Sequence, residues 1–274
     1  MTNPATTSAP GRTTARGWVK ALVAVTFVVM VAVNGLANAL PINGRTTGEV
    51  SDSYPNLFAP AGLTFSIWGL IYLLLAAHVL YQFGLFHDRD GAEGRGALLD
   101  RVGLLFAATS LANTGWILAW HYDLIGLSTV LIATLLVLLI LTTRATRGLT
   151  STRDRLFVRL PFSVYFGWIT VATIANVTTW LVSLGWDGFG IAESTWTVII
   201  LVVGALIGLA TVLRDRDVAY GLVFVWAYFG IWFKHNAADG FAGAHPSVMI
   251  TALACIAAFV AAGVWVLARR RRAA

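Results

Sequence analysis

Long apolar stretches recur along almost the whole chain. A helix needs roughly 20 consecutive apolar residues to cross the hydrocarbon core of a bilayer, and about eight stretches approach that length. They are residues 18–40, 59–84, 102–120, 123–143, 160–184, 195–213, 218–236 and 247–268. With 58% hydrophobic and 12% charged residues, the chain has too little polar surface for a water-soluble globule. The sequence therefore predicts an all-α polytopic membrane protein with about eight transmembrane helices.

The two ends of the chain differ from these stretches. Residues 1–17 are rich in Thr, Ala and Pro, which predicts a disordered cytoplasmic tail. The first apolar stretch follows basic residues, as the core of a signal peptide would, but it is too long and lacks a small-x-small cleavage site. We therefore expect it to be retained as a membrane anchor.

The cations between the stretches fall almost entirely on one side of the membrane. Lys and Arg near helix ends stay in the cytoplasm. If the amino terminus is inside, the inner segments carry Arg12, Arg16, Lys20, Arg89, Arg95, Arg101, Arg144, Arg147, Arg153, Arg155, Arg159, Arg214, Arg216 and the arginines at 269–272. The outer side carries Arg45 and Lys234. This asymmetry predicts a multi-pass protein of the cell membrane with both termini cytoplasmic, and it accounts for the net charge of +6 without a nucleic-acid partner.

Residues that carry ordinary chemistry are scarce inside the stretches. All 13 acidic residues fall in loops or at helix ends, which disfavours ion-driven transport because ion-coupled carriers generally place an ionisable group near the bilayer centre. The sequence has no Walker loop, dinucleotide-binding turn, Cys pair or HExxH motif. We therefore expect no metal site, no required cofactor and no conventional catalytic residues. Lys234, near the outer end of its stretch, is expected to snorkel to lipid headgroups.

Tryptophan is unusually abundant, with 11 residues. Tryptophans near the ends of the stretches are interpreted as interfacial anchors; these are Trp18, Trp120, Trp180, Trp186, Trp196 and Trp265. Others lie deeper, namely Trp68, Trp116, Trp168, Trp226 and Trp232. A deep indole either fills the core or lines a cavity, and the residue type alone leaves both interpretations open.

Amides accompany the deep aromatic residues. Three similar tripeptides lie in the outer halves of their stretches: Leu36-Ala37-Asn38, Leu111-Ala112-Asn113 and Ile174-Ala175-Asn176. A side-chain amide in hydrocarbon needs a partner or a polar cavity, so helix-to-helix hydrogen bonds and a ligand site are both open. Helical spacing places several of these groups on shared faces. The pairs are Trp68 with Tyr72 and Asn113 with Trp116, and one stripe holds Tyr165, Trp168, Ala172 and Asn176.

These residues form a pattern that resembles a known family. The pattern consists of Pro60 with Trp68 and Tyr72, of Asn113-x-x-Trp116, and of Pro161-x-x-x-Tyr165-x-x-Trp168 followed by Ala172 and Asn176. It is similar to the TspO/MBR family of tryptophan-rich sensory proteins and peripheral benzodiazepine receptors, over residues 18–186. The family is a five-helix bundle whose pocket opens toward the loop after the first helix, here residues 41–58. Its members bind porphyrins and other flat lipophilic molecules, and some are reported to degrade protoporphyrin photochemically.

The resemblance implies a porphyrin or haem-type ligand and a set of ligand-binding residues. They are Trp68, Tyr72, Asn113, Trp116, Tyr165, Trp168, Ala172 and Asn176. The chain departs from the family pattern at residues 59–63, which hold one Pro and no Trp, and at 177–180, which lack the Tyr-then-Arg ending associated with sterol recognition. Sterol binding is therefore not expected.

The domain organisation follows from where the resemblance stops. Residues 18–186 are predicted to form a TspO/MBR-like five-helix membrane domain. Residues 187–274 have no counterpart in five-helix members, and we predict a three-helix membrane extension with a basic cytoplasmic carboxyl terminus. Within the extension, Tyr228-Phe229-Gly230 repeats Tyr165-Phe166-Gly167.

The leading functional hypothesis is a membrane receptor or sensor. It would bind a flat hydrophobic ligand, such as a porphyrin, in an aromatic- and amide-lined pocket open to the outer side. One alternative is a secondary carrier for a lipophilic or small organic solute, with the added helices completing its path. Another is a porphyrin-degrading enzyme with Trp redox partners. The expected partners are the lipid bilayer and a hydrophobic small molecule, and the sequence leaves a homodimer open.

Overall fold

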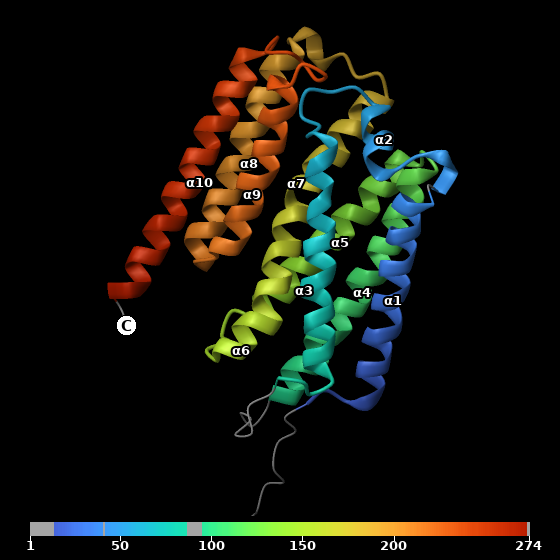
Figure 1. The fold of residues 1–274 in the computed structure, drawn as a ribbon, viewed down its shortest axis with the longest axis vertical. Coiled ribbons are helices and arrows are strands. Elements are labelled where there is room, and N and C mark those ends of the chain that lie inside the picture. Colours follow the sequence, from blue (N-terminus) through green and yellow to red (C-terminus); the bar gives the residue numbers. More distant parts are fainter. Residues whose placement is uncertain (1–13, 41, 87–94, 273–274) are drawn as a thin grey trace, which may run out of the picture.

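The computed structural model describes residues 14–40, 42–86 and 95–272, and every regular element in these ranges is a helix (Figure 1). The long helices are α1 (Gly17–Ala39), α3 (Ile67–Gln82), α4 (Arg95–His121), α5 (Ile125–Ala145), α7 (Leu160–Ser183), α8 (Glu193–Asp215), α9 (Val218–Asn236) and α10 (Pro246–Arg272). The short elements are η1 (Ile42–Gly44), α2 (Thr47–Asp52), η2 (Gly62–Ser66), α6 (Thr152–Asp154), η3 (Arg155–Arg159) and η4 (Gly188–Gly190). The prediction of an all-α polytopic membrane protein is confirmed.

The long helices correspond to the apolar stretches one for one. Within the described ranges, 7 helical segments are long and apolar enough to cross a membrane. The long helix outside this set is α9, whose hydropathy is lowered by Lys234, His235 and Asn236 at its end and by two Tyr and two Trp. It runs beside α8 and α10 (Figure 1) and buries Tyr220, Phe224 and Tyr228. Packing against neighbouring helices therefore buries the large aromatic side chains of α9.

The two ends of the bundle are chemically different. Helix α1 begins and α10 ends at the same end, which also carries α6 (Figure 1); we call this the basic end. At the opposite end, α2 lies beside the ends of α1 and α4 (Figure 1), and we call this the lid end. Which side of the membrane each end faces stays a prediction. Most of the predicted disordered tail, residues 1–13, and the loop cation Arg89 lie outside the described residues.

One apolar core runs through both predicted domains. Its buried members come from α1 through α10. Two glycines allow the closest approaches between the domains: a Cβ on Gly167 of α7 would lie 2.9 Å from the Val223 Cβ of α9, and one on Gly230 of α9 would lie 2.0 Å from the Thr64 Oγ1 of η2. The repeated Tyr-Phe-Gly tripeptide therefore marks two crossing points. The boundary between residues 186 and 187 stays a prediction.

The second apolar stretch begins later than predicted. Residues 59–61 are not helical, η2 follows as a tight turn, and α3 starts at Ile67. The backbone N–H of Ala61 donates to the Gly230 carbonyl of α9 over 3.1 Å. This N–H is therefore paired even though α3 does not extend back to Ala61. The loop at 41–58 also contains α2, which the sequence analysis did not predict. Its start is a capping box between Thr46 and Glu49.

Candidate ligand site

Trp68 lies at the centre of a buried aromatic cluster. Its ring centroid is 5.5 Å from Tyr72, 5.9 Å from Trp116, 6.0 Å from Tyr165 and 6.2 Å from Trp168. These residues come from α3, α4 and α7, and all but Tyr72, which is partly exposed, are buried. Tyr72 stacks on Trp68, while Tyr165 and Trp168 meet it edge to face. The helical spacing that placed each pair on one face thus directs three helices toward one point.

Asn176 ties this cluster to α4 and α5. Its Oδ1 accepts from Trp116 Nε1 over 2.8 Å, and its Nδ2 donates to Ser128 Oγ at 2.9 Å and to Thr129 Oγ1 at 3.1 Å. Ser128 Oγ also lies 3.2 Å from Asn176 Oδ1. The amide is therefore fully occupied by protein partners.

Asn113 is held differently. Its Oδ1 accepts from Asn34 Nδ2 on α1 over 2.8 Å. Its Nδ2 faces the Tyr165 hydroxyl, but neither of these two atoms completes a hydrogen bond of good geometry. One half of this amide thus ties helices together, and the other half is unsatisfied.

Several buried polar atoms beside Trp68 share this condition. Tyr72 Oη and Trp168 Nε1 have no hydrogen-bond partner in the structure, and Tyr165 Oη and Asn113 Nδ2 have only each other, without good hydrogen-bond geometry. Leaving a buried donor or acceptor unpaired costs about 1 to 3 kcal/mol, and buried polar groups in native proteins are almost always paired. These unpaired polar atoms are gathered around one aromatic cluster, whereas the amide of Asn176 beside them is fully paired.

A small cavity adjoins the cluster. Its volume is about 40 Å³. It is lined by residues of α2, α3, α4 and α7 and by Pro60 and Phe65, which lie before α3. Five of the predicted site residues line it: Trp68, Trp116, Trp168, Ala172 and Asn176. The other three, Tyr72, Asn113 and Tyr165, lie in the adjoining cluster. The structure thus brings all eight predicted residues together, while their role in ligand binding stays a prediction.

Helix α2 closes the cavity at the lid end. Thr47 and Ser51 of this helix line the cavity. Trp120 Nε1 donates to the Thr47 carbonyl over 3.2 Å, and His121 Nε2 lies 3.2 Å from Thr47 Oγ1. We call residues 42–54 the lid, because this segment contains α2 and is fastened to α4.

Ionic contacts hold the outer surface of the lid. Asp123, just after α4, accepts hydrogen bonds from Arg45 and from the Tyr54 hydroxyl. Partial burial, followed by the hydrogen bond to Asp123 and its charge, raises the pKa of Tyr54, while Arg45 opposes the shift. Hydrogen bonds from the backbone and side chain of Thr46 lower the pKa of Glu49. At neutral pH the lid is therefore held by an ionised capping carboxylate and an ion pair.

Helix α9 supports the segment that leads from the lid into α3. The contacts are Trp226 Nε1 to Thr64 O at 2.9 Å, Ala61 N to Gly230 O at 3.1 Å, His235 Nε2 to Leu57 O at 2.9 Å, and Lys234 Nζ to Asp52 Oδ1 at 2.7 Å. Lys234 was expected to snorkel to headgroups, but it forms an ion pair with the lid instead. Trp226, which the sequence left between core and cavity, fastens η2.

Sequence reasoning missed part of the site. Trp120 was predicted to be an interfacial anchor, yet it is buried, lines the cavity and bonds to the lid. On α1 the tripeptide singled out Asn38, which is exposed, whereas Asn34 one turn earlier binds Asn113. Asn34 and Asn38 are four residues apart and so lie on the same face of α1, which made that face predictable from the sequence. Which of the two asparagines reaches Asn113 depends on how α1 is rotated about its axis.

These observations define the class: a multi-pass all-helical membrane protein with a buried aromatic and amide cluster beneath a short helical lid. The model of the TSPO-like protein family matches residues 20–265, and the chain belongs to that family. The family resemblance predicted from the Trp, Tyr and Asn pattern is confirmed, and the match extends from α1 into α10, past residue 186. Comparison with curated proteins and with solved structures gives no match.

Proposed function

We propose that this protein is a membrane receptor or sensor that binds a flat hydrophobic ligand, such as a porphyrin, beside Trp68 and beneath the lid. Membership of the TSPO-like family supports a receptor or sensor role. The observation that carries the proposal is the group of unpaired buried polar atoms around an aromatic cluster. A flat ligand would gain dispersion and buried area against the indoles. Its polar edge would pair with Asn113, Tyr72 and Tyr165.

The size of the cavity determines how such a ligand could enter. Ligand sites generally measure about 300 to 1,000 Å³, whereas this cavity is about 40 Å³. That volume suffices for water but not for a tetrapyrrole. Binding would therefore require the lid to move and the indoles of Trp68 and Trp116 to separate. We infer a closed ligand-free state that opens at the lid end.

Titration with protoporphyrin tests the proposal. The protein in nanodiscs should show saturable quenching of Trp fluorescence, since the ligand would stack on indoles. Tyr165→Phe removes one unpaired hydroxyl and should weaken binding about tenfold, the equivalent of one hydrogen bond of about 1.4 kcal/mol. The matched control is Tyr228→Phe, because the Tyr228 hydroxyl already donates to the Leu201 carbonyl over 2.8 Å. Equal affinities for the two variants would reject the assignment of this site.

Two further assays separate the alternatives named above. A carrier would show flux of the ligand across proteoliposomes, and a porphyrin-degrading enzyme would release product under light. A receptor should bind protoporphyrin with neither result.

A further inference from the structure

A second cavity lies at the basic end, far from the aromatic cluster. Its volume is about 820 Å³. Its walls are formed by the segment after α5, by η3 and the start of α7, by the turn between α8 and α9, and by the end of α10. Six arginines line it: Arg147, Arg155, Arg159, Arg214, Arg216 and Arg270. We call this cavity the arginine cleft. It lies between the region predicted as residues 18–186 and the region predicted as 187–274.

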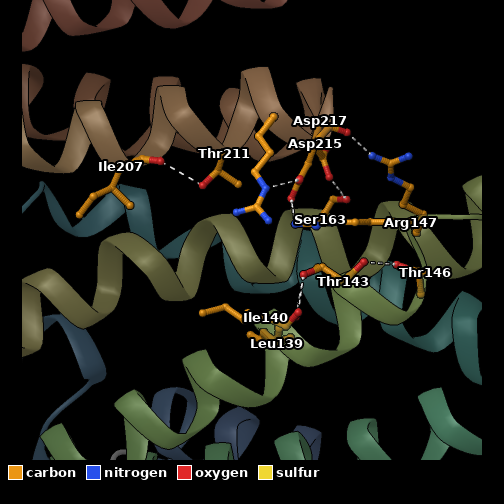
Figure 2. Close-up of polar contacts among 12 residues, drawn as sticks. Leu139, Ile140, Thr143, Thr146, Arg147, Ser163, Ile207, Thr211, Asp215 and Asp217 are labelled. Atoms are coloured by element: carbon orange, nitrogen blue, oxygen red, sulfur yellow. Dashed lines mark hydrogen bonds and ion pairs between the residues drawn. The ribbon is translucent and has the colours of Figure 1, made fainter.

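The positive charge in the arginine cleft is only partly balanced. Asp215 and Asp217 are the acidic residues of its lining, so six guanidinium groups against two carboxylates leave a formal surplus of four positive charges. Asp215 forms an ion pair with Arg147 at 2.7 Å, and Asp217 accepts a hydrogen bond from Ser163 (Figure 2). Asp215 also lies 4.0 Å from Arg214. Arg155, Arg159 and Arg216 lie close enough to Arg270 to repel it, and Asp217 partly offsets this repulsion. Clustered like charges are unfavourable unless an anion neutralises them.

Backbone carbonyls hold several of these arginines in place. Arg159 Nη2 donates to the Asp215 carbonyl over 2.6 Å, Arg155 Nε donates to the Leu149 carbonyl over 3.2 Å, and Arg270 donates to the Arg216 carbonyl. Each guanidinium has five N–H donors, so these single contacts orient the group and leave other donors for a ligand. Planar guanidinium groups match the oxygens of phosphate in bidentate geometry.

We propose that the arginine cleft binds a phosphate-bearing anion. Its volume accommodates a headgroup or a small soluble phosphate compound, and its place at the ends of α5, α7, α8 and α10 is where a lipid phosphate would lie. Basic sites between transmembrane helices commonly take anionic headgroups. The anion would contact residues from both predicted domains, so its binding would stabilise their association. This site is independent of the ligand proposed for the lid end.

Two binding assays identify the source of the phosphate. In the first, the protein in phosphatidylcholine nanodiscs is titrated with inorganic pyrophosphate by calorimetry. In the second, native mass spectrometry measures the retention of phosphatidylglycerol by protein from mixed phosphatidylcholine and phosphatidylglycerol bilayers. Saturable binding in the first assay indicates a soluble phosphate, and retention of lipid in the second indicates a headgroup. Absence of both would overturn the proposal.

Variants then locate the binding. The double variant Arg155→Gln with Arg270→Gln should lose at least about tenfold in affinity, since each removed guanidinium contributes a charge-assisted contact. The matched control removes two exposed arginines of the same end that do not line the cleft, Arg101→Gln with Arg153→Gln, and should stay within about twofold of the wild type. An equal loss in both double variants would mean that general surface charge, and not the cleft, attracts the anion.

A gain of affinity gives a test that misfolding cannot imitate. Asp215→Asn removes the carboxylate that competes for Arg147, and it leaves the backbone carbonyl that orients Arg159 in place. This variant should bind the anion several-fold more tightly. Unchanged or weaker binding by Asp215→Asn would contradict an anion seated among these arginines.

Discussion

At the scale of single residues, the two central amides differ in how many of their hydrogen-bonding groups are already paired. Asn176 uses both its oxygen and its nitrogen in hydrogen bonds with Trp116, Ser128 and Thr129. Asn113 accepts a hydrogen bond from Asn34 through its oxygen, and its nitrogen is unpaired. The sequence presented these amides as equivalents, since both follow Ala in a similar tripeptide. Their contacts assign Asn176 mainly to helix packing and leave the nitrogen of Asn113 for the ligand that we propose.

Replacing each amide by Leu should separate these roles. Asn176→Leu leaves the buried Trp116 N–H without its partner and should lower the free energy of unfolding by about 1 to 3 kcal/mol. Asn113→Leu should leave stability nearer the wild type, because Asn34 Nδ2 still donates to the Met30 carbonyl over 2.9 Å, but should weaken protoporphyrin binding about tenfold. Thermal melts and titrations in the same detergent measure both quantities. The opposite pattern would exchange the two assignments.

At the scale of elements, the lid is the segment that we propose regulates access to the ligand site. It is short, lies outside the long helices, and is fastened mainly by polar contacts to α1, α4, Asp123 and α9. Val50 is its buried aliphatic side chain, and Ile42 and Tyr54 pack against the core while remaining partly exposed. Elements with few buried apolar contacts open at low free-energy cost.

Asp123→Asn should loosen the lid without disturbing the long helices. The variant removes the charge that holds Arg45 and weakens the acceptor for Tyr54. We expect protoporphyrin to associate and dissociate faster, with a smaller change in equilibrium affinity, because the barrier to opening falls. Stopped-flow Trp fluorescence measures both rates. The control is Asp239→Asn, an exposed aspartate between α9 and α10; identical rates for the two variants would show that the lid does not limit entry.

At the scale of the whole molecule, α9 connects the two predicted domains. It packs closely on α7 at Gly167 and on η2 at Gly230, and it bonds to the segment that carries the lid into α3. A disturbance at the crossing of α9 and η2 should therefore reach Trp68, which follows η2 directly.

Gly230→Ala tests this connection. The added methyl would meet Thr64 Oγ1 at 2.0 Å, so the two segments must shift apart, at a cost of about 1 to 3 kcal/mol. We expect a lower melting temperature and weaker protoporphyrin binding. Gly69→Ala on α3 is the matched control, since a methyl there meets nothing within 4 Å. If Gly230→Ala behaved like this control, the extension would be mechanically separate from the ligand site.

Orientation in the membrane is the second question at this scale. The arginines of the basic end predict that it faces the cytoplasm. With Cys255 replaced by Ala, cysteines placed singly at Ser53 and Gly148, both exposed positions, should react differently with an impermeant thiol reagent on intact cells. We expect labelling at position 53 but not at 148. The reverse result would invert the topology.

The sequence by itself determined the helices, the family and the composition of the site. Apolar length is a local property, and a bilayer requires every spanning segment to satisfy its backbone internally, so each long helix could be located. The exceptions in bounds are α3, which begins at Ile67 instead of 59, and α4, which begins at Arg95 instead of 102. Helical spacing likewise grouped Trp68 with Tyr72 and Tyr165 with Trp168. Tertiary structure alone decided which residues meet across helices: Asn34 rather than Asn38 at Asn113, Trp120 beneath the lid, and arginines from distant segments in one cleft. Those pairings depend on how each helix is rotated about its axis and on which turns meet at its ends. The spacing of residues within one helix contains no information about either.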